Sequence, residues 1–259
     1  WQTDYKLSDT ADIQGEAADL GMEEAQHYGA SIEHYLTEET KVKLEAFYKD
    51  YEGLAINIGS YPEKVYSNSG DGHSKGLELM LQKLEGEDYE GWLTYTYSQT
   101  RRKDLEGWYT PDFDITHMLN GFLEMKMGEG TALITNIKYN SGSRYTPIIS
   151  ARKNPETGSL EYKLGDRNSK TFSDYIRLDV WLEWEGVEIL VPIPFLPVSE
   201  HKLAGIFPVL KFEGSTRLGV YNALNNQNQV ENYWNETADR EEYVIDMPRI
   251  AVYGYTIKL

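Results

Sequence analysis

Six residues in two stretches carry side chains that are suited to holding a ligand. They are Trp108, Tyr109, Asp112, Phe113, Arg144 and Tyr145. Aromatic rings offer flat apolar faces, while a carboxylate or guanidinium beside them supplies directional hydrogen bonds. The first stretch therefore suits an apolar or sugar-like ligand bordered by acid. The same rings also pack loops or sit where oil meets water, and the Tyr-Thr-Pro turn after Arg144 is a common structural motif, so both interpretations stay open.

The sequence contains no arrangement of residues that marks a catalytic or metal centre. The histidines at positions 27, 34, 73, 117 and 201 lie on separate segments without the spacing of a zinc site. The acidic stretches lack the spacing of an EF-hand loop, which favours solvated carboxylates over a calcium site. A glycosidase pair needs a defined separation across a cleft, and nothing in the sequence fixes one. We therefore predict a protein without enzymatic activity, cofactor or bound metal.

Composition narrows the classes of protein further. The net charge of −17 over 259 residues argues against nucleic acid as a partner. The chain holds 20 Tyr and 6 Trp against 7 Phe, and such amphipathic rings are typical of interfaces rather than of a soluble core. Cysteine is absent, which excludes disulfides within these residues. No run of 18 apolar residues predicts a transmembrane helix, and no signal peptide is evident, so we expect a mature or excised piece that starts with Trp1.

The stretch Gly91–Ser98 is the clearest of the elements that must position these side chains. Leucine and tyrosine alternate there with threonine and serine, which predicts a β-strand with one apolar and one polar face. The alternation recurs at 26–36, 41–51, 77–82, 117–127, 131–141, 176–184, 216–224 and 251–259. In the segment 41–51 the polar side carries lysines and a glutamate, which cannot face a dry core. One face of the predicted sheet is therefore exposed to water.

The connections between these strands alternate between short turns and long loops. The long segments are 52–74, 101–116, 142–175 and 225–249, and an up-and-down meander places all of them at one end. A proline-rich stretch, Val187–Phe212, interrupts the pattern because prolines disfavour a central strand. The pattern predicts an all-β, antiparallel up-and-down transmembrane β-barrel portion of about nine strands, with short periplasmic turns and longer extracellular loops.

Several motifs, taken in order, resemble the C-terminal barrel portion of TonB-dependent outer-membrane receptors. They are Leu44–Tyr51, Asn68–Leu79, Tyr95–Ser98 followed by Arg101, Asp114 and His117, Asn140–Pro147, Arg177–Val180, Gly219–Asn225 and Gly254–Leu259. The resemblance covers most of the chain. Leu259 departs from the aromatic residue with which the family usually ends, and the stretch Val187–Phe212 stands where the family has a short turn.

The resemblance implies about nine strands of a larger, 22-stranded barrel with a plugged lumen. Residues 1–25 would be an extracellular loop or the end of a preceding strand, and residues 26–259 the C-terminal part of the barrel, with 187–212 at its periplasmic end. The function implied is import of a scarce bulky ligand, such as a siderophore, cobalamin, glycan or peptide, across the outer membrane of a Gram-negative bacterium. The partners implied are outer-membrane lipid, an N-terminal plug, the remaining strands on the same protein or another chain, and the TonB complex.

Two other interpretations stay open. A soluble β-sandwich or barrel that binds carbohydrate through exposed aromatics explains the tyrosines and the acidity, but not the placement of the long loops. A non-transporting, receptor-like outer-membrane component explains the proline-rich stretch and the missing plug. Under the membrane hypothesis we expect lipid contacts from Leu93, Tyr95, Leu178, Val180 and Leu182. We expect Lys43, Glu78 and Asp179 to line the lumen.

Overall fold

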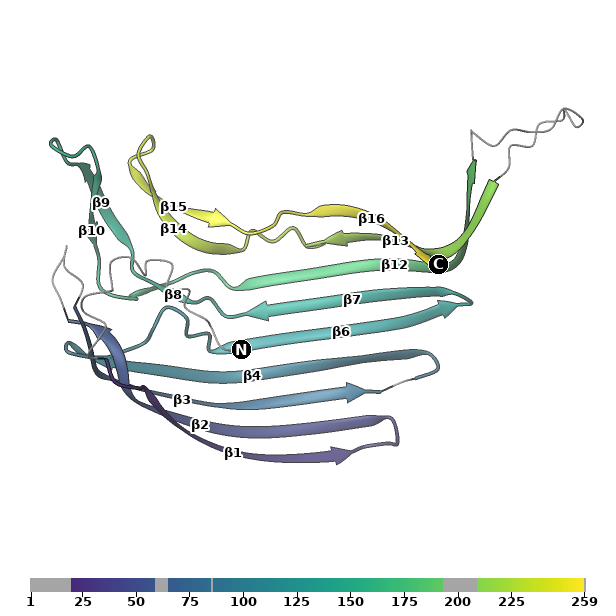
Figure 1. The fold of residues 1–259 in the computed structure, drawn as a ribbon, viewed down its shortest axis with the longest axis horizontal. Coiled ribbons are helices and arrows are strands. Elements are labelled where there is room, and N and C mark those ends of the chain that lie inside the picture. Colours follow the sequence, from purple (N-terminus) through teal and green to yellow (C-terminus); the bar gives the residue numbers. More distant parts are fainter. Residues whose placement is uncertain (1–19, 59–64, 85, 193–208, 259) are drawn as a thin grey trace, which may run out of the picture.

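The computed structural model describes residues 20–58, 65–84, 86–192 and 209–258, which form an all-β fold (Figure 1). One antiparallel sheet contains nine consecutive neighbours: β1 (Glu24–Tyr35), β2 (Thr40–Asn57), β3 (Tyr66–Lys83), β4 (Tyr89–Asp104), β6 (His117–Gly128), β7 (Thr131–Asn140), β12 (Tyr175–Pro192), β13 (Val209–Tyr221) and β16 (Ile250–Lys258). β5 (Gly107–Tyr109) adds a short pairing to β4. No helix among the described residues is long and apolar enough to cross a membrane.

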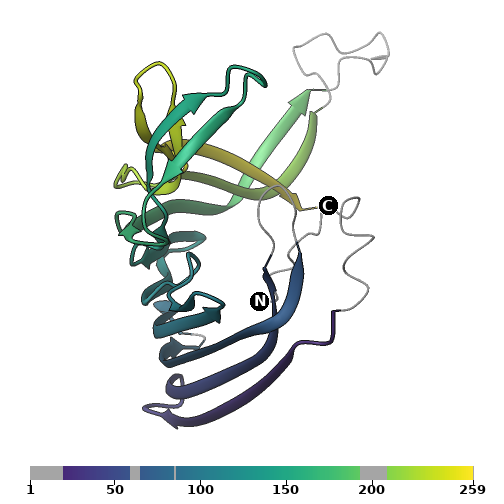
Figure 2. The same cartoon turned by 90° about the vertical axis from the view of Figure 1, so that its left-hand side faces the viewer.

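The long connections contain small sheets of their own. β8 (Arg144–Tyr145) pairs with β11 (Lys170–Thr171), β9 (Ile148–Lys153) with β10 (Leu160–Leu164), and β14 (Gln229–Asn235) with β15 (Arg240–Ile245). These pairs lie at one end of the large sheet, and the short turns lie at the other (Figure 1). Figure 2 shows the large sheet bent into a curved, open wall. The predicted antiparallel meander is confirmed, and this single sheet is not the two-sheet arrangement of the sandwich alternative.

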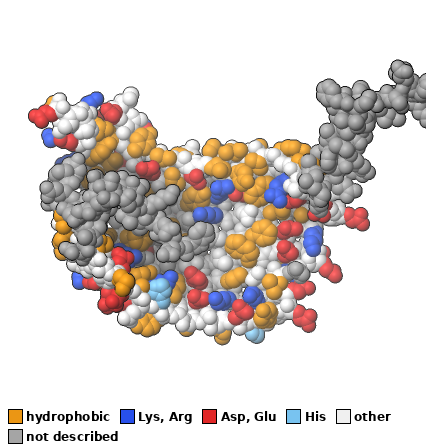
Figure 3. All heavy atoms as spheres, viewed as in Figure 1, with side chains coloured by type: hydrophobic (Ala, Val, Ile, Leu, Met, Phe, Trp, Pro, Cys, Tyr) orange, Lys and Arg blue, Asp and Glu red, His pale blue; other side chains and the backbone are white. Residues whose placement is uncertain are grey.

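Strand register gives the wall two chemically different faces. One row of cross-strand neighbours reads Ile32, Leu44, Leu79, Tyr95, Leu119, Tyr139 and Ile176. The next row, on the opposite face, reads Glu33, Lys43, Met80, Thr94, Asn120, Lys138 and Arg177. Lysine, arginine, aspartate and glutamate side chains are spread over the concave side of the wall (Figure 3). The apolar rows therefore face outward, on the convex side.

The residues predicted to meet lipid and lumen separate onto these two faces. The strand alternation puts Leu93, Tyr95, Leu178, Val180 and Leu182 on the convex face. It puts Lys43, Glu78 and Asp179 on the concave face. A slip of one residue would exchange the two sets, so this register carries the whole polarity of the wall.

The predicted long loop at 52–74 is wrong in extent. β2 continues to Asn57 and β3 already begins at Tyr66, so each strand has 18 residues rather than about 9–11. The ladder survives there through irregular pairing of Leu54 with Gly70. Asn68 supports it, because its amide nitrogen donates to the carbonyl oxygen of Gly53 at 2.6 Å. The prediction for residues 1–25 falls mainly on positions outside the described residues.

The proline-rich stretch is partly a continuation of two strands. β12 and β13 remain paired as far as Pro192 and Val209, and the tip at 193–208 lies outside the described residues. β12 pairs with β7 only as far as Trp184, so the two strands leave the wall as a narrow ribbon. Figure 1 shows this ribbon projecting beyond the short-turn end.

A buried tryptophan fixes the concave face near the C-terminal strands. The Trp181 indole lies directly over Gly219 and meets the Tyr221 ring edge-on, with centroids 5.2 Å apart. A Cβ atom added at Gly219 would overlap this indole. Glycine is therefore required here by the close approach of a neighbouring ring.

We predict that Gly219→Val destabilises the folded protein by about 1–3 kcal/mol, because the added side chain displaces Trp181. Unfolding of the purified protein by denaturant measures the change. Gly254→Val on the adjacent strand is the matched control, since a Cβ atom there meets nothing within 4 Å. Equal stability of the two variants would contradict the packing role of Gly219.

Candidate ligand-binding site at the long-loop end

The long connections line an open cavity of about 530 Å3 at their end of the wall. Its volume lies within the range of small-molecule sites. Its lining comes from the β5–β6 connection, from residues 143–172 and from β14. Four residues that the sequence singled out line it together, namely Asp112, Phe113, Arg144 and Tyr145.

An aromatic cluster forms one wall of the cavity. The ring of Tyr145 stacks on Phe172 with centroids 4.3 Å apart, and Tyr243 meets both rings edge-on. The hydroxyl groups of Tyr145 and Tyr243 are hydrogen-bonded at 2.9 Å. Burial and this bond raise the pKa of the Tyr145 phenol well above its usual value. Tyr145 therefore acts as a structural residue of the loops, although it lines the cavity.

A carboxylate connects β14–β15 to the 142–175 connection. Glu241 Oε1 accepts hydrogen bonds from the backbone N–H of Ile148 at 2.6 Å and from the side-chain amide of Asn232 at 2.9 Å. The Asn232 amide also donates to the carbonyl oxygen of Thr146 at 3.2 Å. Bonds to a charged acceptor are stronger than neutral ones, so this carboxylate holds the two connections firmly together.

Asn168 ties the third connection to the same network. Its backbone is left-handed, with φ of 49°, a conformation that asparagine tolerates better than most residues. The Asn168 side-chain amide donates to the carbonyl oxygen of Thr110 at 2.9 Å. Its backbone N–H donates to Thr146 Oγ1 at 3.0 Å. The connections that line the cavity are therefore bonded to one another.

Two buried asparagines anchor the 222–249 connection to β12. The Asn228 side chain accepts from the N–H of Ile176 at 2.8 Å and donates to its carbonyl oxygen at 3.0 Å, which imitates a strand ladder. Asn222 donates its backbone N–H to Asp179 Oδ1 at 2.8 Å. Its side-chain amide donates to the carbonyl oxygen of Met247 at 2.9 Å. Only 1% of the surface of either asparagine is exposed, so these bonds are shielded from water.

The charged side chains at the cavity make no hydrogen bonds or ion pairs among the described residues. The Arg144 side chain is exposed and makes no hydrogen bond or ion pair with any described residue. The carboxylates of Asp112 and Glu231 are exposed on the same cavity. A guanidinium without a partner can bind an anionic group through two parallel hydrogen bonds. The cavity thus combines an available cation, available acids and aromatic surface.

Asp114 lies behind the cavity as a structural acid. It is buried, and Oδ1 accepts the backbone N–H of Thr100 at 2.6 Å. Burial raises the pKa of the Asp114 carboxyl, in spite of that bond and the nearby Arg144 and Arg101. Of the two aspartates beside Phe113, only Asp112 is therefore available to a ligand.

Trp108 and Tyr109 do not line the cavity. β5 places Trp108 opposite Lys103 and Tyr109 opposite Arg102, on opposite faces of the sheet. Trp108 packs against His73 on the convex face, with ring centroids 5.1 Å apart. The His73 ring in turn stacks on that of Tyr48. Trp108 is therefore part of the outer aromatic belt.

Tyr109 is covered by a second cation of the loops. The guanidinium of Arg167 lies 3.4 Å from the centre of the Tyr109 ring and forms an ion pair with Asp104. Burial is the largest single influence and acts to raise the pKa of Asp104, but the ion pair with Arg167 and nearby backbone N–H groups together lower it. Tyr109 thus stacks against Arg167, and neither residue lines the cavity.

Arg102 joins the cavity to the concave face. Its guanidinium lies 4.4 Å from the centre of the Tyr51 ring and 5.7 Å from that of Phe113. Among the described residues its Nη1 is the one buried side-chain nitrogen or oxygen without a hydrogen-bond partner. Phe113 thus contributes to the cavity on one side and packs against a cation on the other.

Several of the remaining cavity residues were missed because they come from segments distant in the sequence. Phe172, Val230, Glu231 and Asn232 belong to connections that meet only after the strands have paired. Turn-forming residues such as Asn168 predict a loop, but not which neighbour it touches. No candidate metal cluster occurs among the described residues.

Comparison with known proteins identifies the fold. The pyoverdine outer membrane receptor FpvA of Pseudomonas aeruginosa aligns over 93% of this chain and 30% of its own, with 14% identity and a TM-score of 0.59. The FrpB iron transporter of Neisseria meningitidis aligns over 93% of this chain and 32% of its own length, with 13% identity and a TM-score of 0.57. The ferric-catecholate import receptor Fiu of Escherichia coli aligns over 91% and 27%, with 12% identity and a TM-score of 0.56.

The chain therefore has the fold of part of the barrel of these outer-membrane receptors and spans about a third or less of their length. No protein-family model matches the sequence. No curated protein matches it either. The fold that the sequence motifs implied is confirmed by structure rather than by sequence identity.

We predict that Tyr145→Phe and Tyr145→Ala affect the loops unequally. The phenylalanine variant keeps the stack on Phe172 and loses one hydrogen bond, at a cost of about 0.5–1.5 kcal/mol. The alanine variant loses the ring and costs about 3–5 kcal/mol. The rate of native-state proteolysis within residues 142–175 of the full-length protein measures the destabilisation in each variant. Equal cleavage rates would show that the ring stack does not hold the loops.

We predict that acid loosens the 222–249 connection through Asp246. The Tyr175 hydroxyl donates to Asp246 Oδ2 at 2.7 Å, and this bond lowers the pKa of the carboxyl, as does the N–H of Met247. Because the folded pKa lies below the unfolded one, the stabilisation is present above the unfolded pKa and is lost as pH falls through the folded pKa. Proteolysis within 222–249 should therefore accelerate below about pH 4.

The Asp246→Asn variant should be cleaved faster than the wild type at neutral pH, and its cleavage rate should change less as the pH falls. Asp239→Asn, in the exposed turn between β14 and β15, serves as the control and should keep the wild-type profile. A profile of Asp246→Asn identical to the wild type would rule out this carboxyl as the source of the acid dependence.

Proposed function

We propose that this chain is the C-terminal part of the barrel wall of a TonB-dependent outer-membrane receptor. On this proposal it imports a scarce bulky ligand across the outer membrane of a Gram-negative bacterium and carries out no bond chemistry. The observation that carries the proposal is the nine-stranded wall with an apolar convex face and a charged concave face. Its match to outer-membrane receptors over about nine-tenths of the chain supports the same assignment.

The open edges support the proposed partners. Neither β1 nor β16 has a second neighbour among the described strands. A strand edge exposed to hydrocarbon leaves backbone groups unpaired, which costs several kcal/mol for each group. We infer that further strands, on the same protein or another chain, close the barrel. An N-terminal plug would fill the lumen and receive the pull of the TonB complex.

The proposal assigns the two ends of the wall to opposite sides of the outer membrane. The long connections would face the exterior, together with residues 1–25, and the ligand cavity would open there. The projecting β12–β13 ribbon, within the stretch 187–212, would lie on the periplasmic side with the short turns. The outer aromatic belt of Tyr48, His73 and Trp108 would then mark the outer boundary of the bilayer.

The lining of the cavity suits a ligand that carries an anionic group beside an apolar or aromatic surface. Arg144 is available for the anion, and Phe113 offers an exposed ring. Ferric siderophores combine these features, and FpvA, Fiu and FrpB are by their names iron or siderophore receptors. Cobalamin, glycans and peptides are the other ligand classes to test.

Site-directed labels test the membrane part of the proposal. The chain has no cysteine, so single cysteines can be labelled specifically within it. Spin labels at Leu93, Tyr95, Leu178, Val180 and Leu182 of the full-length protein should respond to a lipid-soluble quencher. Labels at Lys43, Glu78 and Asp179 should respond to a water-soluble one. Equal accessibility of the two sets would overturn the assignment to a membrane wall.

Binding to purified full-length receptor tests the ligand part. Ferric siderophores, cobalamin, oligosaccharides and peptides form the panel, and one class should bind saturably. Arg144→Ala should weaken that binding at least about tenfold, as expected for a lost hydrogen bond to a charged group. Arg152→Ala is the control, because Arg152 pairs with Glu161 on the separate β9–β10 hairpin. Correct labelling without binding of any class would favour the non-transporting component.

A further inference from the structure

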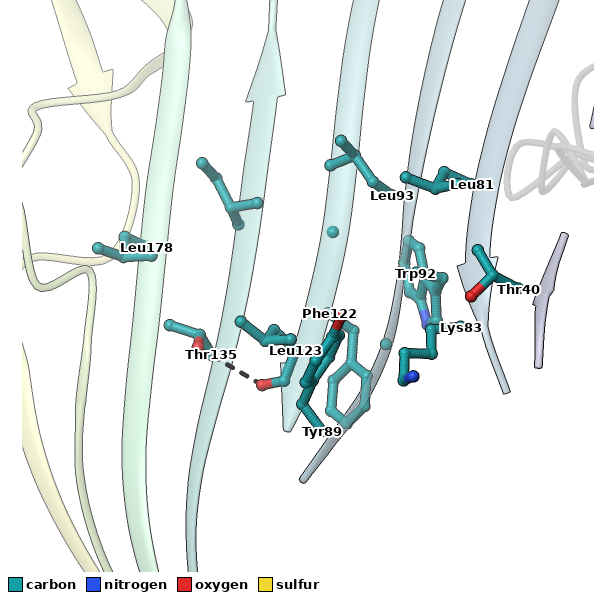
Figure 4. Close-up of a pocket in the computed structure, with 13 residues that line it drawn as sticks. Thr40, Leu81, Lys83, Tyr89, Trp92, Leu93, Phe122, Leu123, Thr135 and Leu178 are labelled. Carbon is teal, nitrogen blue, oxygen red and sulfur yellow. Dashed lines mark hydrogen bonds between the residues drawn. The ribbon is translucent and has the colours of Figure 1, made fainter. Parts of the chain in front are cut away.

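The convex face is not uniformly smooth, and one hollow in it lies near the short-turn end. This hollow has a volume of about 460 Å3 and is bounded by residues of β2, β3, β4, β6, β7 and β12 (Figure 4). Leu81, Leu93, Leu123 and Leu178 are among the side chains around it. The hollow is therefore an apolar depression in the surface that the proposed function turns toward lipid.

Two glycines make the depression. Gly91 and Gly121 are neighbours of Leu123 and Leu93 in the ladder between β4 and β6, and neither contributes a side chain. A Cβ atom at Gly121 would lie 2.9 Å from Leu93 Cδ1 and 3.0 Å from Ile137 Cγ2. Leu93 and Ile137 therefore close in over Gly121, and the absence of side chains at the two glycines leaves a shallow apolar groove among the surrounding side chains.

The rim of the hollow at the short-turn end is charged. Lys83 Nζ lies 4.7 Å from the centre of the Tyr89 ring and 2.9 Å from Glu39 Oε2. The negative charges of Glu39 and Asp88 both act on this ammonium group. The rim therefore presents one cation that is paired with Glu39 and lies within the influence of Asp88, beside an apolar groove.

We propose that this hollow binds a phospholipid whose headgroup is zwitterionic and carries a primary amine. One acyl chain lies in the groove over Gly91 and Gly121. The lipid phosphate meets Lys83, and the lipid ammonium meets Glu39 and Asp88. The inference rests on the proposed membrane function, and it goes further by assigning one resident lipid to one place on the wall.

The charge balance at the rim selects the headgroup. A phosphate alone would gain the attraction of Lys83 but would face two carboxylates. An added ammonium reverses the sign of the second interaction, so an amine-bearing zwitterion is favoured over an anionic lipid. Lys83 has three donors, so it can bind a phosphate oxygen while it keeps Glu39 as a partner.

Native mass spectrometry of the full-length protein in detergent tests the site. The probes are phosphatidylethanolamine and phosphatidylglycerol with identical acyl chains. The wild type should retain one phosphatidylethanolamine with at least a severalfold preference over phosphatidylglycerol. Lys83→Gln should lose retention of both lipids, whereas Glu39→Gln should lose the preference. Lys126→Gln is the matched control, because Lys126 lies at the same end of the wall but on the concave face and should leave retention unchanged.

A second pair of variants tests the groove independently of the rim. Thr135→Leu and Leu93→Trp place larger side chains in the hollow and should reduce retention of both lipids. Equal retention of the two lipids by the wild type, or retention that none of these variants alters, would overturn the lipid site. The cysteine labels keep the two proposals separate. Correct labelling with no lipid preference removes only the lipid site, whereas equal accessibility of both label sets removes the membrane function itself.

Discussion

Pairing of backbone N–H and C=O groups between neighbouring strands is the constraint on which the rest of this structure depends. An unpaired group in hydrocarbon costs several kcal/mol, so a wall that crosses a bilayer has to be a continuous ladder. The nine strands from β1 to β16 form such a ladder. Once it is formed, side chains can point in only two directions, which converts a simple alternation in the sequence into one apolar and one charged surface.

The same requirement is met differently where the strands end. In the long connections, side-chain amides take over from strand neighbours, as when Asn228 pairs with both backbone groups of Ile176. Glu241 and Asn168 extend this bonding across three connections. The result is a cavity with a bonded frame and an unbonded Arg144. A frame that is already ordered loses little conformational freedom when a ligand binds.

Most of the wall was predictable from the sequence because alternation reports directly on strands. Gly91–Ser98 falls entirely within β4, and its apolar face is the convex face. The segment 52–74 was misjudged because glycine, serine and asparagine are typical of loops, whereas here the pairing of β2 with β3 and the amide of Asn68 keep them in the ladder. The loop contacts of Phe172 and Asn232 could not be predicted, since they depend on how three distant connections meet.

The aromatic residues show why composition alone cannot locate a binding site. Trp108 and Tyr109 are adjacent and chemically similar, yet their pairing with Lys103 and Arg102 sends them to opposite faces. One joins the outer belt beside His73, and the other lies under Arg167. Phe113, a few residues later, lines the cavity. A short strand of three residues therefore decides on which face of the sheet each ring lies, and composition alone does not reveal this register.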